Sequence, residues 1–304
     1  MPVPPPWTVP ASAAGATLAA VVRDASGEPW SVVKKWIALG KVAVAGAPAL
    51  EIDRRMRGGE AIEVRLAAPK PRDPSREGDL VHDDAHVVVI DKPAGISSVP
   101  YDERETGTAM DLIRGAWRRM GRQATQTPLL VVHRIDKATS GLLMFAKSKR
   151  AELGLAAQLR DHSCERAYRC VAHGVMRART IESWLVTDRG DGLRGSTGHA
   201  HQGKRAVTHV AVVEELRDAT VCEVRLETGK THQIRIHLAE AGHPLVGEEV
   251  YDKDYRNAGN RVLAAPRLML HAMTLGFVHP ITGARLRFER PPPPAMRDWI
   301  ASRR

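Results

Sequence analysis

A tight polar cluster at residues 133–136, His-Arg-Ile-Asp, stands just before an apolar run at residues 142–146. An apolar run of this length predicts a buried strand. Asp136 is therefore expected at one edge of a core element, beside an arginine and a histidine, which makes it a candidate catalytic carboxylate. A simpler interpretation is that Asp136 forms a turn or an exposed ion pair, and composition alone favours it.

Two further segments carry residue types that catalysis uses. Residues 229–239 contain, in order, Lys230, His232, Gln233 and Arg235. An arginine within hydrogen-bond reach of an aspartate would keep that carboxylate ionised and fix its orientation. Tyr168 lies in residues 164–170, and a tyrosine can pack its ring on a base and exchange a proton through its hydroxyl. Taken alone, each also fits a structural interpretation, as a surface arginine and a packing tyrosine.

Residues 133–143 resemble the signature motif of the RluA family of pseudouridine synthases, His-Arg-Leu-Asp-x-x-Thr-Ser-Gly-Leu-Leu, with Ile135 replacing leucine. Residues 229–238 resemble its Gly-Arg-Thr-His-Gln-Ile-Arg-x-His-Leu segment, and residues 166–168 its Lys-x-Tyr segment. Weaker matches at 91–95, 203–208 and 267–283 keep the family order. An ordered series of motifs is far more specific than any one of them.

The resemblance implies a role for each matched residue. Asp136 falls on the family's catalytic aspartate, Tyr168 on its active-site tyrosine and Arg235 on the arginine that accompanies the aspartate. The substrate-binding residues that it implies are His133, Arg134, Thr139, Lys230, His232, Gln233 and Ile236. Among these, Arg134 is expected to occupy the stack that the flipped base leaves, and Ile236 to pack against the uracil.

Three positions depart from the family's motifs. Arg166 takes the lysine position of Lys-x-Tyr. Lys230 replaces an arginine, which keeps the charge but loses the bidentate fork. Glu248 replaces the aspartate that usually follows Gly247. None of these changes touches the catalytic carboxylate.

The implied reaction isomerises specific uridines in structured RNA. The base must be cut from its sugar, rotated and rejoined through carbon five, so the uridine must first be flipped out of its stack. Basic side chains are expected to hold the phosphates. The sequence leaves open whether Asp136 acts on the sugar or on the ring. Because no redox step or external group transfer is needed, we expect no cofactor and no metal.

Composition agrees with a nucleic-acid partner. The 304 residues carry a formal net charge of +10, and the sequence pI is about 9.8, a balance that suits an anionic partner. Three cysteines without a Cys-x-x-Cys pair favour a reducing compartment over a thiolate zinc site. No apolar run is long enough for a membrane span and no secretory signal begins the chain. We therefore expect a cytoplasmic monomer that binds RNA and no membrane.

Residues 17–66 predict a small separate domain. Two short helices, around residues 18–22 and 30–39 with Ser31 as N-cap, precede strands at 41–44 and 61–65. This order resembles the alpha-L RNA-binding module that many members of the family carry. Its expected RNA-binding residues are Lys34, Lys35, Lys41, Arg54 and Arg55. A structural domain with a solvated basic face is the alternative.

The rest of the chain predicts a larger α+β domain. Residues 1–16 are expected to be a disordered tail, 67–80 a linker rich in proline and charge, and 81–304 the catalytic domain. Strands are expected at 87–90, 166–173, 206–214 and 220–227, and helices at 107–120 and 149–161. Short strands with few helices favour a mixed, mainly antiparallel sheet flanked by helices, the pseudouridine synthase fold.

Three alternatives remain open on sequence alone. An RNA-binding ribosome-assembly factor without catalysis explains the charge equally well, but does not need Asp136, Tyr168 and Arg235 together. A metal hydrolase is suggested by 13 histidines, although His232 and His237 are five apart and no His-Glu-x-x-His occurs. The RNA target is either ribosomal or transfer RNA, and the N-terminal module favours large-subunit ribosomal RNA.

Overall fold

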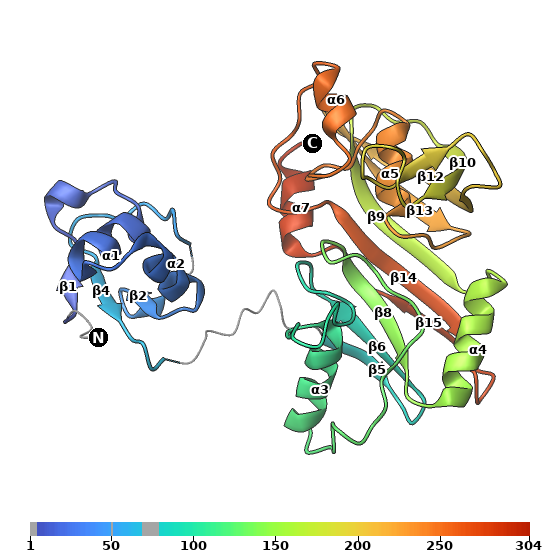
Figure 1. Cartoon of the computed structure of the whole chain (residues 1–304), viewed down its shortest axis with the longest axis horizontal. Coiled ribbons are helices and arrows are strands. Elements are labelled where there is room, and N and C mark those ends of the chain that lie inside the picture. Colours follow the sequence, from blue (N-terminus) through green and yellow to red (C-terminus); the bar gives the residue numbers. More distant parts are fainter. Residues whose placement is uncertain (1–4, 50, 69–78) are drawn as a thin grey trace. The chain divides into compact units, whose positions relative to one another are not determined.

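The computed structural model describes residues 5–49, 51–68 and 79–304. The chain forms two compact units, Met1–Pro74 and Ser75–Arg304 (Figure 1). The division falls inside the expected linker at 67–80, most of which lies outside the described residues. None of the helices in the described ranges is long and apolar enough to cross a membrane.

The first unit packs two helices against a four-stranded sheet. The sheet order is β1-β4-β2-β3, and its strands are β1 (Trp7–Thr8), β4 (Ala61–Val64), β2 (Val42–Val44) and β3 (Ala47–Pro48). Helix α1 spans Leu18–Ser26 and α2 spans Trp30–Ala38. The Thr17 hydroxyl accepts a hydrogen bond from the backbone N–H of Ala20 and caps α1, and Gly27 ends that helix in the left-handed conformation.

Two expectations for this unit are wrong. Residues 7 and 8 are not part of a disordered tail, because Trp7 and Thr8 pair with Ile62 and Ala61 as the edge strand β1. Ser31 is not the N-cap of α2, because the helix begins one residue earlier, after Pro29. The fixed φ of proline suits a position at the start of a helix. With Pro29 in that position, Ser31 falls inside the first turn.

The second unit is built on one large sheet. Its main strand order is β11-β10-β12-β13-β9-β14-β8-β6-β5, with β15 paired to β14 and β7 to β8. The strands are β5 (Asp79–Asp83), β6 (Val87–Lys92), β7 (Leu130–Val131), β8 (Ser140–Ala146), β9 (Glu165–His173), β10 (Arg179–Val186), β11 (Gly195–Thr197), β12 (Lys204–Glu215), β13 (Ala219–Leu226), β14 (Leu270–Val278) and β15 (Arg285–Glu289). Among the described strands only β8 and β14 run parallel. The predicted α+β class with a mainly antiparallel sheet is confirmed.

Helices cover both faces of this sheet, which explains the unbroken apolar runs of β6 and β8. Alternate residues of the two strands pack in different clusters: Val88, Ile90, Leu143 and Phe145 with α3 (Ala109–Arg119), and Val87, Val89, Leu142 and Met144 with α4 (Lys149–Arg160). Strands buried on both faces need apolar side chains at every position. Helices α5 (Gln233–Glu240), α6 (Lys253–Asn257) and α7 (Pro294–Ala301) complete the unit.

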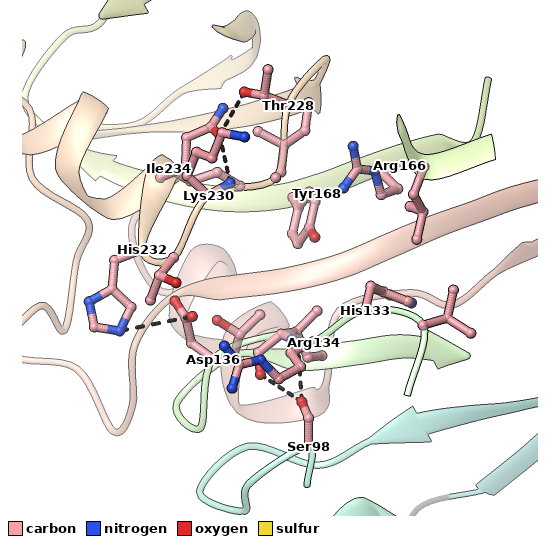
Figure 2. A pocket seen from close by; sticks show the side chains of 18 of the residues that line it. Ser98, His133, Arg134, Asp136, Arg166, Tyr168, Thr228, Lys230, His232 and Ile234 are labelled. Carbon is pink, nitrogen blue, oxygen red and sulfur yellow. Dashed lines mark hydrogen bonds and ion pairs between the residues drawn. The ribbon is translucent and has the colours of Figure 1, made fainter. Parts of the chain in front are cut away.

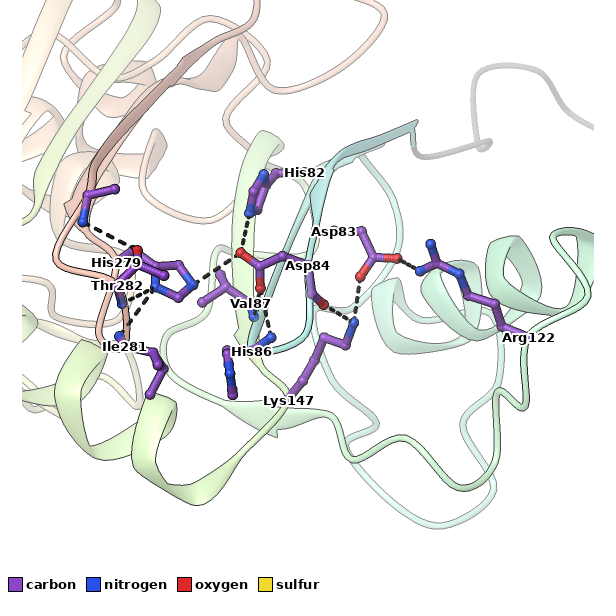
Figure 3. A network of polar contacts seen from close by, with 11 residues as sticks. His82, Asp83, Asp84, His86, Val87, Arg122, Lys147, His279, Ile281 and Thr282 are labelled. Carbon is purple, nitrogen blue, oxygen red and sulfur yellow. Dashed lines mark hydrogen bonds and ion pairs between the residues drawn. The ribbon is translucent and has the colours of Figure 1, made fainter.

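A polar network fixes the turn after β14 to the turn after β5 (Figure 3). The Asp84 carboxylate lies 3.1 Å from His279 Nε2 and 2.8 Å from His82 Nε2. His279 Nδ1 accepts hydrogen bonds from the backbone N–H groups of Ile281 and Thr282. His279 Nε2 faces the Asp84 carboxylate, so the ring links the two turns.

Candidate active site

A large cavity in the second unit, about 1220 Å³, lies where several segments meet. They include residues 97–101 after β6, residues 131–139 from the end of β7 to the start of β8, residues 226–235 from the end of β13 into α5, and Arg166 and Tyr168 of β9. Asp136, Tyr168 and Arg235, which lie far apart in the sequence, all line it. Figure 2 shows the Asp136 and Tyr168 side chains entering this space from the loop before β8 and from β9.

The loop that carries Asp136 is clamped from behind by buried polar groups. The Ser98 hydroxyl donates to the carbonyl of Ile135 at 2.7 Å and accepts from its N–H at 3.1 Å. The buried Lys92 ammonium donates to the carbonyls of Pro93, Ile96 and Lys137 at 3.0, 2.9 and 3.3 Å. These contacts join the turn after β6 to the Asp136 loop, so the carboxylate stands on a fixed backbone.

Two cationic or donor side chains flank the Asp136 carboxylate, one at each oxygen. His232 Nε2 lies 3.9 Å from Oδ1, and Arg235 Nη1 lies 3.8 Å from Oδ2. The Asp136 side chain is 22% exposed, so it is open to the cavity. Both distances exceed a hydrogen bond, as is common in active sites without substrate, where contacts tighten on binding.

Arg235 is the expected neighbour of Asp136, but its main partner is Glu248. Its Nε and Nη2 form a bidentate pair with the Glu248 carboxylate at 2.8 and 2.6 Å. Burial acts to raise the pKa of Glu248, and the hydrogen bonds from Arg235 reverse this and lower it. Glu248 also accepts from the backbone N–H groups of Glu249 and Val250. Only Nη1 of the guanidinium therefore faces Asp136.

Tyr168 is 8% exposed and stands on β9 beside Arg166. Burial raises the pKa of its hydroxyl, and the charge of Arg166 opposes this. The phenol is therefore neutral at physiological pH, and in this state it can donate as well as accept a hydrogen bond. Arg166 donates to the Glu227 carbonyl through Nη2, while its buried Nε has no partner among the described residues.

Three of the expected substrate-binding residues have distinct environments. His133 is neutral, because burial lowers its pKa to about 3 and Nε2 accepts the N–H of Met144. Gln233 uses its amide fully on the protein, since Oε1 accepts from Thr228 and from the Lys230 N–H, and Nε2 donates to the Val207 carbonyl and the Thr208 hydroxyl. Thr139 Oγ1 is buried without a described partner.

Ile236 does not line the cavity. It is 1% exposed and packs with Leu185, Ala206 and Tyr251 on the far side of α5. Ile234, two residues earlier, lines the cavity instead. Because two residues span about 200° of an α-helix, these side chains cannot share a face. Arg134, which is exposed, and Lys230 and His232 do line the cavity.

Known proteins match this chain over most of its length. A family model described as RNA pseudouridylate synthase matches residues 86–240. A ribosomal large subunit pseudouridine synthase D from Zymomonas mobilis is 36% identical over 243 residues, which cover 77% of this chain and 76% of that protein. The chain belongs to the RNA pseudouridylate synthase family.

Further relatives of this synthase support the same family assignment. The protein named ribosomal large subunit pseudouridine synthase D from Neisseria meningitidis serogroup A is 36% identical over 304 residues, or 94% of this chain and 78% of its own. The structure of human RNA pseudouridylate synthase domain containing 1 covers 74% of this chain and 89% of its own, with a TM-score of 0.59 and 21% identity. At that identity, the structure supports the fold alone.

Sequence reasoning missed residues that shape the synthase's cavity. Ser98 and Lys92 hold the loop that carries Asp136, and the turn at 91–95 was the only signal for them. Tyr101 is 95% exposed at the cavity's edge, and nothing in the sequence marked it. Tyr251 contacts His232 and Arg235, and it lies 16 residues after Arg235, outside the motif that led to that arginine.

Two histidines near this site serve structural contacts. His237 pairs with the hydroxyls of Ser183 and Thr208, both at 2.9 Å, and His243 with the carbonyl of His173. Within the described ranges, no group of three or more histidine, cysteine or acidic residues is arranged to hold a metal ion.

The expected RNA-binding residues of the first unit fall into two groups. Lys34 and Lys35 are exposed on α2 and form no ion pair among the described residues. Lys41, Arg54 and Arg55 contact the unit itself, through the Ala68 carbonyl, Glu60 and the Gly15 carbonyl.

Proposed function

We propose that this synthase converts specific uridines of large-subunit ribosomal RNA to pseudouridine, with Asp136 as the catalytic carboxylate. The observation that supports this proposal most directly is that Asp136, Tyr168 and Arg235, from three separate segments, line one cavity. Ribosomal RNA is favoured over transfer RNA because the relatives from Zymomonas and Neisseria bear the name of a ribosomal large subunit enzyme.

The cavity suits a flipped nucleotide. Its volume of about 1220 Å³ holds a nucleoside together with part of the neighbouring backbone. Cationic side chains surround the opening and can pair with phosphates; they are Arg134, Lys137, Arg160, Arg194, Arg205 and Lys230. Arg134, exposed and next to the catalytic loop, would fill the space that the base leaves in the RNA stack.

The reaction needs nothing but the substrate and the side chains present. The bond from the sugar to ring nitrogen one breaks, a bond to carbon five forms, and the proton on carbon five leaves for the ring nitrogen. Asp136 acts on the sugar or on the ring, with Arg235 and His232 beside its oxygens. Ile234 and Tyr168 would pack on the uracil from the walls of the cavity.

The first unit is proposed to be an alpha-L type RNA-binding domain. Its exposed Lys34 and Lys35 on α2 can approach phosphates without breaking an existing ion pair among the described residues. Residues 81–304 form the catalytic domain in this proposal, and the enzyme acts as a monomer in the cytoplasm.

Asp136→Asn tests the function. The amide keeps the shape but cannot take a proton, so turnover should fall at least about 1000-fold while RNA binding stays within about threefold. Wild-type and variant enzyme are incubated with large-subunit ribosomal RNA and with transfer RNA, and pseudouridines are mapped chemically. Asp298→Asn, an exposed residue of α7 outside the cavity, is the matched control.

Each outcome has a definite meaning. Turnover retained in Asp136→Asn would contradict the role of Asp136. Pseudouridine found in transfer RNA alone would overturn the ribosomal target, and none in either RNA with the wild-type enzyme would overturn the activity.

A further inference from the structure

Tyr251 is a buried residue that contacts both groups flanking Asp136. Its hydroxyl oxygen lies 2.7 Å from His232 Nδ1, and the guanidinium carbon of Arg235 stands 5.2 Å above its ring. The side chain is 8% exposed and packs with Leu185, Ala206 and Ile236. One fixed aromatic ring therefore supports the histidine on one side and the arginine on the other.

His232 is held in an unusual backbone conformation. It precedes α5 with φ 58° and ψ 17°, the left-handed region that residues other than glycine seldom adopt. Such conformations cost free energy and persist where the surroundings require them. The His232 and Tyr251 rings meet edge to face, with their centroids 5.6 Å apart. The imidazole also points toward Asp136 (Figure 2).

The surroundings of His232 favour its neutral form. Burial lowers its pKa, while Asp136 and Glu248 act to raise it and Arg235 and Arg194 to lower it. Burial also raises the pKa of Tyr251, so its hydroxyl keeps its proton. A neutral imidazole has one N–H, and the partner of one nitrogen decides which nitrogen carries it.

Two arrangements of that proton are possible, and electrostatics separates them. If Tyr251 donates to Nδ1, the proton of His232 is on Nε2 and points at the Asp136 carboxylate. If Nδ1 donates to Tyr251, a lone pair of Nε2 faces Asp136, and two negative partial charges then oppose each other. The first arrangement is the stable one next to an ionised carboxylate.

We propose that Tyr251 and His232 form a positioning pair for Asp136, in which the tyrosine hydroxyl donates to Nδ1 and reinforces the Nε2–H tautomer that the carboxylate favours, so that the histidine donates to the carboxylate. This inference rests on the proposed role of Asp136 and deepens it. The 3.9 Å separation closes to a hydrogen bond when the nucleotide displaces water from the cavity. His232 thereby orients the carboxylate for the reaction.

Tyr251→Phe removes the hydroxyl and keeps the ring beneath Arg235. Without a donor to Nδ1, the Nε2–H tautomer loses its support, and kcat should fall about 10- to 100-fold, the factor that one charge-assisted hydrogen bond is worth. The KM for RNA should stay within about threefold. The acid limb of the kcat profile should move to higher pH, because a carboxylate that loses a donor holds its proton more tightly.

Tyr255→Phe is the matched control. It removes a phenolic hydroxyl in α6, outside the cavity, where no hydrogen bond from that hydroxyl occurs among the described residues. Its kcat and pH profile should equal those of the wild type. Thermal unfolding of both variants checks that neither has lost its fold.

His232→Gln supplies the decisive comparison. Its amide nitrogen can donate to Asp136 without any help from Tyr251, so adding Tyr251→Phe to His232→Gln should cost less than twofold. The same factor of loss in both backgrounds would overturn the pair, as would a wild-type kcat and pH profile in Tyr251→Phe. If one of these two results is found while Asp136→Asn is inactive, this inference fails and the proposed function stands.

Discussion

Gly141 is a position where one added methyl group should strongly destabilise the second unit. It is the second residue of β8, has φ +114°, and pairs with Ala272 in the short parallel contact between β8 and β14. A Cβ atom at Gly141 would lie 2.2 Å from the Ala272 oxygen, 2.7 Å from its nitrogen and 2.8 Å from its carbonyl carbon. These are backbone atoms, so no side-chain rotation relieves the overlap.

The expected loss has two parts. The left-handed backbone costs an alanine about 1–2 kcal/mol, and pushing the strands apart adds about 1–3 kcal/mol. Gly141→Ala should therefore lower the free energy of unfolding by about 2–5 kcal/mol, and Tm of this domain by about 5–15 °C. Activity should fall as well, because β8 directly follows the loop that carries Asp136.

Gly192→Ala isolates the backbone part. Gly192 has φ +79° and nothing within 4 Å of an added Cβ, so it should lose only about 1–2 kcal/mol. Urea unfolding followed by circular dichroism, with thermal melts of both variants, measures the difference. An equal loss in Gly141→Ala and Gly192→Ala would refute the overlap argument, because it would leave only the backbone cost.

Two further predictions concern residues around the cavity. Burial lowers the pKa of Lys92 to about 7, below its value in the unfolded chain. At low pH, the cost of keeping the lysine protonated in the folded state therefore lowers the free energy of unfolding. This cost disappears as the pH rises from 7 towards 10. Urea unfolding should show that the free energy of unfolding of the wild type rises relative to that of Lys92→Met across that range. A difference that stays constant with pH would show that the three carbonyls bonded to Lys92 keep its ammonium charged. Tyr101, exposed at the cavity's edge, should stack on a base next to the flipped uridine. Tyr101→Ala should weaken RNA binding about 5- to 100-fold in a filter assay, with Tyr101→Trp restoring it, whereas unchanged affinity in the alanine variant would exclude stacking.

The sequence was sufficient for the positions that a motif fixes and insufficient for the direction of side chains. The motif predicted that Asp136, Tyr168 and Arg235 share a site, and all three line one cavity. It misplaced Ile236, because the face of α5 that meets the cavity depends on where the helix begins. With α5 beginning at Gln233, Ile234 faces the cavity and Ile236 the core.

Contacts between motifs were harder still to predict. The sequence marked Glu248 as a departure from the family pattern without indicating its partner. In the structure, Glu248 forms the fork with Arg235, and the following segment brings Tyr251 under His232. Such contacts depend on how two loops pack, and no local pattern of residue types records that packing.

The buried polar groups of this site are of two kinds: some have all their hydrogen bonds within the protein, and others have a polar atom that is free to bind RNA. Ser98 and Gln233 are buried, and each has its hydrogen-bonding groups engaged by the protein, so they position the two loops. Thr139 Oγ1 and Arg166 Nε also line the cavity and are buried, yet have no partner among the described residues. An unsatisfied buried polar atom costs about 1–3 kcal/mol, and a protein keeps that cost where a ligand removes it. The flipped nucleotide is the ligand that would complete both groups, and this distinguishes them from the saturated residues around them.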